Sequence, residues 1–267
     1  MARKRKRIVI ISDMHSGHVV GLTPPDFWQN ETGGTVPRQD KFARIQRESW
    51  EWYRSTIASL KPIDVLLVNG DCIDGRGERS GGTELLTSNR QSQVDMAVQC
   101  IKLAKASAVM MTYGTAYHTG QLEDWEDAIA ERVDASIGSH EWPEVNGLVF
   151  DMKHHIGSSS IPHGRHTAIA RDRLWNVLWA ERERQPKARV IIRSHVHYFQ
   201  AVQTADFLAL TTPALQAAGT KYGGRRCSGT VDFGLIHFDV DEHGGYTWKH
   251  HQAALASESA HPTVLCE

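Results

Sequence analysis

Aspartate and histidine recur in this sequence at spacings that suit metal binding. Asp13 and His15 stand two residues apart after an apolar run, and His195 and His197 do the same after another. In extended backbone, residues two apart point to one side, so Asp13 and His15 can reach one ion together. Asp71 follows a third apolar run, and its carboxylate can bridge two ions. Imidazole and carboxylate are common ligands of divalent metals, and together these residues predict a metal site.

The segments that must position these residues are short apolar runs at 8–12, 65–69, 108–113 and 190–193. Runs of this kind are typical of strands buried on both faces, and ligands in such sheets come from the carboxyl ends of the strands. Apolar residues at three- and four-residue spacing between the runs predict helices, which we place at 41–60, 91–105, 122–133 and 168–184. The alternation of strands and helices predicts an α/β fold.

The pattern changes after residue 196. Segments 199–211 and 230–240 resemble strands with no long helix between them, which predicts an antiparallel continuation of a second sheet. The glycine-rich segment 219–229 predicts a mobile loop, and 253–267 has no periodicity. We therefore expect one domain over 1–252 and a C-terminal tail over 253–267.

The composition narrows the class of protein. The 267 residues carry a formal net charge of −1, which does not suggest a dedicated nucleic-acid-binding protein. The four cysteines, Cys72, Cys100, Cys227 and Cys266, lie too far apart to suggest a zinc knuckle or a disulfide framework. The basic segment 3–7 precedes an apolar run that is too short for a signal peptide or a membrane span. We expect a soluble, cytoplasmic protein without a membrane partner.

These segments, in this order, resemble the calcineurin-like metallophosphoesterases. The family pattern of D-x-H, G-D-x-x-D and H-x-H matches residues 13–15, 70–74 and 195–197, and the similarity spans about 8–199. It implies a four-layer αββα sandwich of mixed sheets with helices on the outer faces. Where the family has G-N-H, this sequence has Gly114-Thr115-Ala116-Tyr117-His118. This segment is similar to a phage-encoded branch with G-T-x-x-H.

The resemblance implies a ligand set for two divalent ions. Asp13, His15 and His197 would hold one ion, Asp71 would bridge, and His195 would help to hold the second. Aspartate and histidine without thiolate favour Mn²⁺, with Fe, Zn²⁺ or Mg²⁺ as alternatives.

Four further residues take roles from the same resemblance. Asp74 resembles the carboxylate that orients a catalytic histidine. His118 is either the general acid or a ligand that replaces the asparagine for which Thr115 stands, and we favour the acid. The family's lone middle histidine matches His154 or His155; strand alternation does not choose between them, and we favour His155 as the ligand.

The expected function is hydrolysis of a phosphoester bond by a metal-activated water. A phosphodiester, nucleotide or nucleic-acid substrate is preferred. The alternatives are a phosphomonoesterase and a degenerate, non-catalytic metal-binding scaffold, which the loss of asparagine at Thr115 favours. Arg76, Arg79, Arg225 and Arg226 are either contacts for a substrate phosphate or solvated loop charges.

Overall fold

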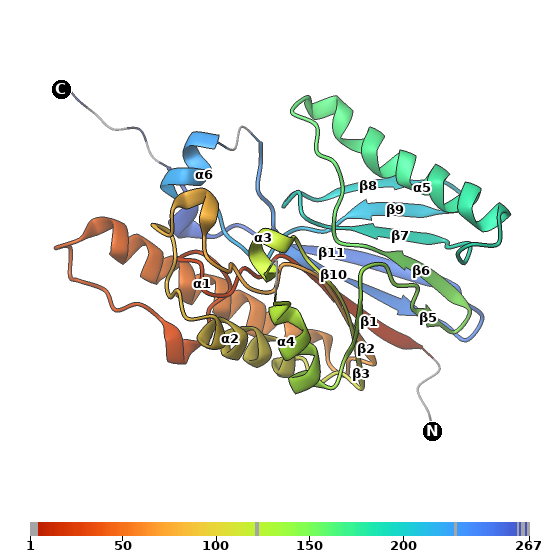
Figure 1. Ribbon diagram of the computed structural model, residues 1–267, viewed down its shortest axis with the longest axis horizontal. Helices are drawn as coiled ribbons and strands as arrows, with labels where there is room; N and C mark the ends of the chain where they lie inside the picture. The colour runs from red at the N-terminus through yellow and green to blue at the C-terminus, as the bar shows by residue number, and fades with distance from the viewer. Residues whose placement is uncertain (1–4, 121–122, 227–228, 261, 263–264, 266–267) are drawn as a thin grey trace.

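The computed structural model describes residues 5–120, 123–226, 229–260, 262 and 265. Two mixed β-sheets lie face to face in it, with helices outside them (Figure 1). The strands are β1 (Lys6–Ile11), β2 (Val65–Asn69), β3 (Ala108–Thr112), β4 (Ser136–Gly138), β5 (Glu144–Val145), β6 (Leu148–Met152), β7 (Val190–Arg193), β8 (Gln200–Gln203), β9 (Leu208–Thr211), β10 (Phe233–Val240) and β11 (Tyr246–Ala253). The helices are α1 (Pro37–Leu60), α2 (Arg90–Leu103), α3 (Ala116–Thr119), α4 (Trp125–Val133), α5 (Arg165–Glu181) and α6 (Lys221–Arg226).

The first sheet has the strand order β11-β10-β1-β2-β3-β4, and β1 to β4 run parallel. The second sheet has the order β5-β6-β7-β9-β8, with β6, β7 and β9 parallel and the two edge strands antiparallel. The carboxyl ends of the parallel strands in each sheet therefore meet at one edge, and the loops that follow them can combine their side chains.

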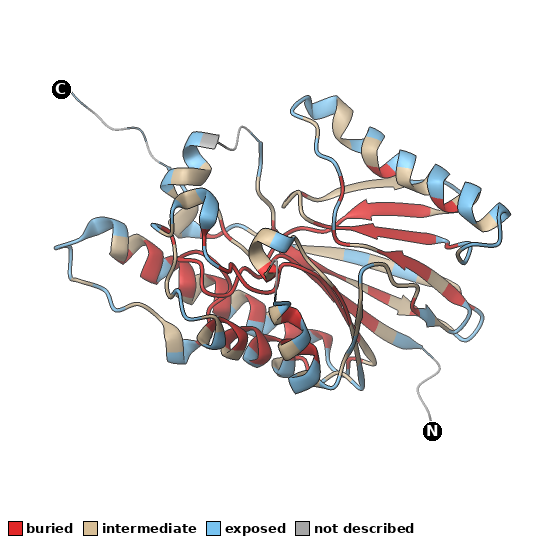
Figure 2. Cartoon of the chain, in the orientation of Figure 1, coloured by how far each residue is buried: buried red, intermediate tan, exposed pale blue. Residues whose placement is uncertain are grey.

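The core explains why the central strands are apolar on both faces. Ile8 and Ile10 of β1 pack between the sheets with Phe150 of the second sheet, whereas Val9 and Ile11 pack toward the helices α1, α2 and α4. On the other side of the molecule, α5 covers the second sheet (Figures 1 and 2). The layers run helix, sheet, sheet, helix, and the α/β fold with two mixed sheets is confirmed.

One sheet assignment from the sequence is wrong. Segment 230–240 does contain a strand, but β10 pairs antiparallel with β1 of the first sheet, in the register Lys6↔Val240 to Ile10↔Ile236. Its side chains are apolar on both faces: Ile236 and Phe238 pack between the sheets, and Phe233 and Leu235 pack with the helices. A strand that is apolar on both faces is favoured in the interior of a sheet. β10 lies between β11 and β1, whereas continuing the second sheet beyond β8 would have placed it at an edge.

Smaller differences lie at the ends of elements. Segment 199–211 divides into β8 and β9, and the expected loop at 219–229 contains the short helix α6. Strand β11 occupies 246–253, for which we expected no strand. Arg3, Lys4, Cys227 and Cys266 lie outside the described residues. Within the described ranges, no helix is both long enough and apolar enough to cross a membrane.

A buried ion-pair network joins the second sheet to its helix. Asp151 on β6 lies 2.8 Å from Nη1 of Arg193 on β7 and 2.8 Å from Nε2 of His140. It also accepts a hydrogen bond of 2.8 Å from Asn176 on α5. Burial opposes ionisation of Asp151, but His140 and Arg193 lower its pKa to about 2. The carboxylate is therefore charged at neutral pH.

We expect Asp151→Asn to lower the free energy of unfolding by about 3 kcal/mol at pH 7, because the buried guanidinium of Arg193 loses a carboxylate partner. Because the pKa of Asp151 is lower in the folded state, its ionisation stabilises the folded protein fully above the unfolded pKa of about 3.9. This contribution is lost as the pH falls toward the pKa of the folded state. Urea unfolding should thus show a gap between variant and wild type at pH 7 that narrows below about pH 4. The exposed Asp206→Asn is the control, and equal stability of the three proteins at pH 7 would contradict the network's role.

Candidate metal centre

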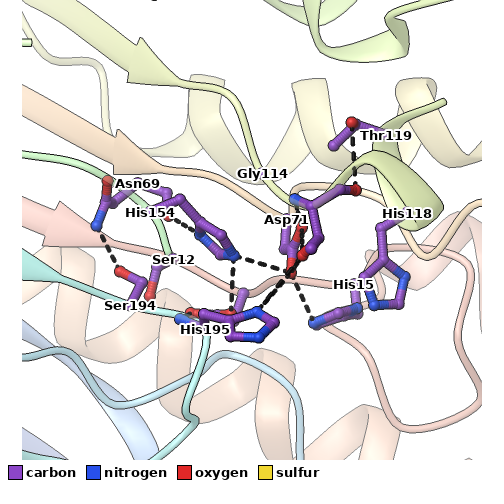
Figure 3. Close-up of polar contacts among 12 residues, drawn as sticks. Ser12, His15, Asn69, Asp71, Gly114, His118, Thr119, His154, Ser194 and His195 are labelled. Carbon is purple, nitrogen blue, oxygen red and sulfur yellow. Dashed lines mark hydrogen bonds and ion pairs between the residues drawn. The ribbon is translucent and has the colours of Figure 1, made fainter. Parts of the chain in front are cut away.

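The loops after four strands bring histidine and aspartate together at one edge of the two sheets. Asp13 and His15 follow β1, and Asp71 follows β2. His154 follows β6, and His195 and His197 follow β7. Figure 3 shows Asp71 between His15, His154 and His195. The predicted metal ligands are therefore neighbours in space: Asp13, His15, Asp71, His195 and His197.

The distances define two overlapping groups around Asp13 and Asp71. Nε2 of His197 lies 3.2 Å from Oδ1 of Asp13 and 3.2 Å from Nε2 of His15. Oδ2 of Asp71 lies 3.0 Å from Nε2 of His154, and 3.9 Å from both Nδ1 of His195 and Nε2 of His15. Asp71 therefore belongs to both groups, as a bridging carboxylate must.

Among the described residues, three sets of side chains have ligand atoms within 4.8 Å of one another. They are Asp13, His15 and His197; Asp71, His154 and His195; and His15, Asp71 and His118. The first two sets share no residue, so each can surround its own ion, and the third shares His15 with the first set and Asp71 with the second.

The backbone of these residues is unusual. Asp13, His15, Asp71, His195 and His197 have φ values of 49°, 44°, 51°, 72° and 56°. This left-handed region is uncommon for residues other than glycine, and strained backbone of this kind tends to cluster at functional sites. An abrupt turn at each residue directs its side chain into the space between the strand ends.

The turned loops hold one another in place. The N–H of Asp13 donates to the carbonyl of Gly70 at 3.0 Å, and the N–H of His15 donates to that of Asp71 at 3.0 Å. Position 114 requires glycine because the loops after β2 and β3 approach each other closely there. A Cβ at this position would lie 2.2 Å from the backbone nitrogen of Asp71. The loops after β1, β2 and β3 therefore form one interlocked layer.

The electrostatics of the cluster fit a cation. The carboxylates of Asp13 and Asp71 are buried. Burial opposes ionisation of Asp13, but His197 and His154 lower its pKa to about 2. Burial likewise opposes protonation of His154, but Asp71 and Asp13 raise its pKa to about 10. The carboxylates thus attract positive charge strongly.

Two ligand atoms also lack hydrogen bonds. In the described part of the chain, Oδ1 of Asp13 and Nε2 of His154 are buried and form no hydrogen bond of normal geometry, although each lies within 3.2 Å of another side chain of the cluster. Buried polar atoms without a partner are rare, and an ion is one explanation for them. The donor set of carboxylate oxygen and imidazole nitrogen is compatible with a divalent transition metal.

The structure places His154, and not the expected His155, in this cluster. His154 is 1% exposed, and it continues the phase of Leu148, Phe150 and Met152, which face the space between the sheets. The side chain of His155 is exposed, and its ring lies 4.7 Å from that of His195. The inward phase of β6 thus continues past the strand end, and the geometry favours His154 over His155 as the candidate ligand.

Asp74 lies next to two histidines. Its Oδ1 lies 3.1 Å from Nδ1 of His15 and 3.5 Å from Nδ1 of His118. Nδ1 of His118 also lies 3.0 Å from the backbone carbonyl of Asp74. Both acceptors favour a proton on Nδ1 of His118, which leaves Nε2 as the nitrogen that can exchange a proton with a substrate.

Thr115 contacts the shared carboxylate. Its N–H donates to Oδ1 of Asp71 at 2.6 Å, and its hydroxyl lies 2.9 Å and 2.7 Å from Oδ1 and Oδ2. Thr115 therefore positions Asp71 from the place where the family pattern has asparagine.

Two supporting residues were not singled out from the sequence. Glu126 of α4 is fully buried, and it accepts the N–H groups of Cys72 at 2.8 Å and Gly114 at 2.7 Å. Nothing in the sequence near Glu126 indicates this role. Asn69 donates to the hydroxyl of Ser194 at 2.6 Å and joins the two sheets. The position of Asn69 directly before Gly70-Asp71 could have indicated from the sequence that it supports the cluster.

The cluster opens into a cavity of about 570 Å³. His15, Asp71, His118, His195 and His197 line its floor together with residues from distant loops, among them Ser158, Ser159, Ser160, Arg165, Thr220 and Tyr222. Arg79 lines the cavity, but Arg76 and Arg225 do not among the described residues.

Comparisons with known proteins add little to this geometry. No family model matches the chain, and no curated protein matches its sequence. Similar solved structures include a Vps29 single mutant from Entamoeba histolytica, with 10% identity, a TM-score of 0.46 and coverage of 93% of this chain and 99% of that chain. Another is described as a novel archaeal phosphodiesterase, with 14% identity, a TM-score of 0.44 and coverage of 92% and 99%. Similarity this low carries no functional argument.

Proposed function

We propose that this chain is a metal-dependent phosphoester hydrolase with a dinuclear site. The observation that carries the proposal is the pair of adjacent ligand groups beside the cavity, with Asp71 of the second group 3.9 Å from His15 of the first. Asp13, His15 and His197 would hold one ion, and His154 and His195 would hold the second. When bound, divalent ions would lower the pKa of a coordinated water and neutralise charge on the phosphoryl oxygens.

The chain's own residues supply positioning and a proton. His118 lines the cavity, and Asp74 fixes its Nδ1, so Nε2 of the protonated ring would donate to the leaving oxygen. Thr115 and Glu126 hold the loops that carry Asp71 and Gly114. We propose a phosphodiester as substrate and Mn²⁺ as the favoured ion, because the cavity extends well beyond the cluster and imidazole ligands favour transition ions over Mg²⁺.

Hydrolysis of bis-p-nitrophenyl phosphate and p-nitrophenyl phosphate tests this proposal. With Mn²⁺, we expect faster turnover of the diester, and no turnover of either after treatment with EDTA. Faster turnover of the monoester would instead indicate a phosphatase. Absence of turnover with Mn²⁺, Fe²⁺, Zn²⁺ and Mg²⁺ alike would exclude the hydrolase.

Metal removal should also lower thermal stability. An ion present at 100 times its Kd stabilises the folded state by about 2.7 kcal/mol. For a protein of this size, such a loss lowers Tm by roughly 5–10 °C. Differential scanning calorimetry with Mn²⁺ and with EDTA measures the shift. An unchanged Tm, together with no metal in elemental analysis, would contradict the metal centre.

A non-catalytic scaffold is the second candidate, and the contacts of Thr115 favour it. Both oxygens of Asp71 lie within hydrogen-bond distance of the Thr115 hydroxyl, which would compete with a bridging role. The ion count separates the candidates: two ions per chain support the hydrolase, whereas none support the scaffold.

A further inference from the structure

Two arginines in the cavity wall are stacked on tyrosines. The guanidinium of Arg79 lies 4.1 Å from the ring centre of Tyr117, and that of Arg165 lies 4.2 Å from the ring centre of Tyr198. All four residues line the 570 Å³ cavity. Stacking restricts a guanidinium and leaves its N–H edges free to bind an anion.

Each tyrosine is the direct neighbour of a histidine in the cluster. Tyr117 precedes His118 in α3, the short helix that follows β3, and Tyr198 follows His197 in the loop after β7. The first segment belongs to one sheet and the second segment to the other. One arginine–tyrosine pair is therefore tied to the metal cluster from each sheet.

The charges of these two arginines are not neutralised by the protein. In the described ranges, neither Arg79 nor Arg165 has a carboxylate oxygen within 4.0 Å, whereas Arg38, Arg44, Arg47, Arg54, Arg132 and Arg193 each have one. Nη1 of Arg165 donates to the hydroxyl of Thr230 at 3.0 Å, and its buried Nε has no partner.

The cavity also contains Glu78 and Glu84. Glu84 accepts the N–H of Tyr222 at 2.8 Å and lies 3.6 Å from both His18 and Arg38. Glu78 is exposed beside Arg79 without pairing to it. Two uncompensated cations therefore remain in the wall of a cavity whose floor is suited to a phosphoryl group.

We propose, resting on the hydrolase function above, that the substrate is single-stranded nucleic acid. Arg79 and Arg165 bind the two phosphates that flank the scissile one. A monoester or a small diester has no further phosphate for either guanidinium, whereas a polynucleotide has one on each side. Asp71 and His15, which line the cavity, are at most 2% exposed, so the scissile phosphate must enter a recess, which a flexible strand does more readily than a rigid duplex.

The test compares three diesters with Mn²⁺: bis-p-nitrophenyl phosphate, a dinucleoside monophosphate and a tetranucleotide with free hydroxyl ends. Only the central linkage of the tetranucleotide has a phosphate on both sides. We expect its KM to lie about 100-fold below that of the dinucleoside, about 10-fold for each charge-assisted contact. DNA and RNA versions should both show this, and the same sequence within a duplex should be a poor substrate.

Arg79→Gln and Arg165→Gln should each raise the KM for the tetranucleotide about 10-fold, and leave turnover of bis-p-nitrophenyl phosphate within about 2-fold. Each substitution should also reduce the slope of log KM against log salt concentration by about 0.7, which is the change expected when a protein loses one phosphate contact to a single strand. Arg182→Gln is the matched control. The guanidinium of Arg182 lies 5.7 Å from the ring centre of Trp179, and Arg182 does not line the cavity. It should behave as wild type.

The outcomes separate this inference from the function on which it rests. If neither a diester nor p-nitrophenyl phosphate is hydrolysed, the hydrolase proposal fails, and with it this inference. If all three are hydrolysed but the tetranucleotide binds no better than the dinucleoside, or if the two variants match Arg182→Gln, the flanking-phosphate inference fails alone. Equal loss on bis-p-nitrophenyl phosphate would show that the arginines support the fold of the site and would also overturn it.

Discussion

Asp71→Asn should reduce kcat/KM for phosphodiester hydrolysis at least about 1000-fold, which corresponds to about 4 kcal/mol of transition-state stabilisation. Asp71 is the residue common to two of the ligand groups, and an amide in its place removes the negative charge that both ions would share. The amide oxygen can still accept the N–H of Thr115, so the loop should keep its conformation.

Elemental analysis and circular dichroism complete the experiment. We expect fewer than two ions per chain in the variant and an unchanged spectrum. Asp95→Asn is the control, because Asp95 pairs with Arg132 on the surface of α2 and should leave activity and metal content unchanged. Full activity of Asp71→Asn would rule out a bridging role for this carboxylate.

His118→Asn should reduce kcat about 100-fold or more for a nucleotide substrate, the range expected for loss of a general acid. The loss should be much smaller for bis-p-nitrophenyl phosphate, because p-nitrophenolate leaves readily without a proton. The rate loss should therefore increase with the pKa of the leaving alcohol, as measured over a series of diesters.

The same variant decides between the two roles considered for His118. A general acid can be removed without loss of metal, whereas removal of a ligand lowers the ion count. We expect two ions per chain in His118→Asn and in the exposed control His163→Asn. Loss of an ion, with equal rate losses on all leaving groups, would make His118 a ligand.

The sequence was sufficient to predict the residues that follow the central strands. A strand that is apolar on both faces must be central, and the polar residues after it must lie at the edge of the sheet. This reasoning located Asp13, His15, Asp71, His195 and His197 without a structure. Strand parity would also have selected His154 if the inward face of β6 had been recognised from Leu148, Phe150 and Met152.

The remaining features depend on contacts between distant segments. The place of β10 beside β1 is a pairing across more than 200 residues, and no local pattern specifies it. Glu126 lies in an ordinary amphipathic helix, and its role arises only because α4 packs beneath the loops after β2 and β3. Arg165 likewise gains a place in the cavity because α5 begins near Tyr198.

The left-handed backbone at five ligand positions bears on how the protein acquires its metal. Hydrogen bonds between neighbouring loops hold these turns. We therefore expect divalent ions to exchange at the site without refolding of the loops. The metal recovered from purified protein would then reflect which ion was abundant during expression, and reconstitution with another ion should restore a full complement within the time of simple mixing.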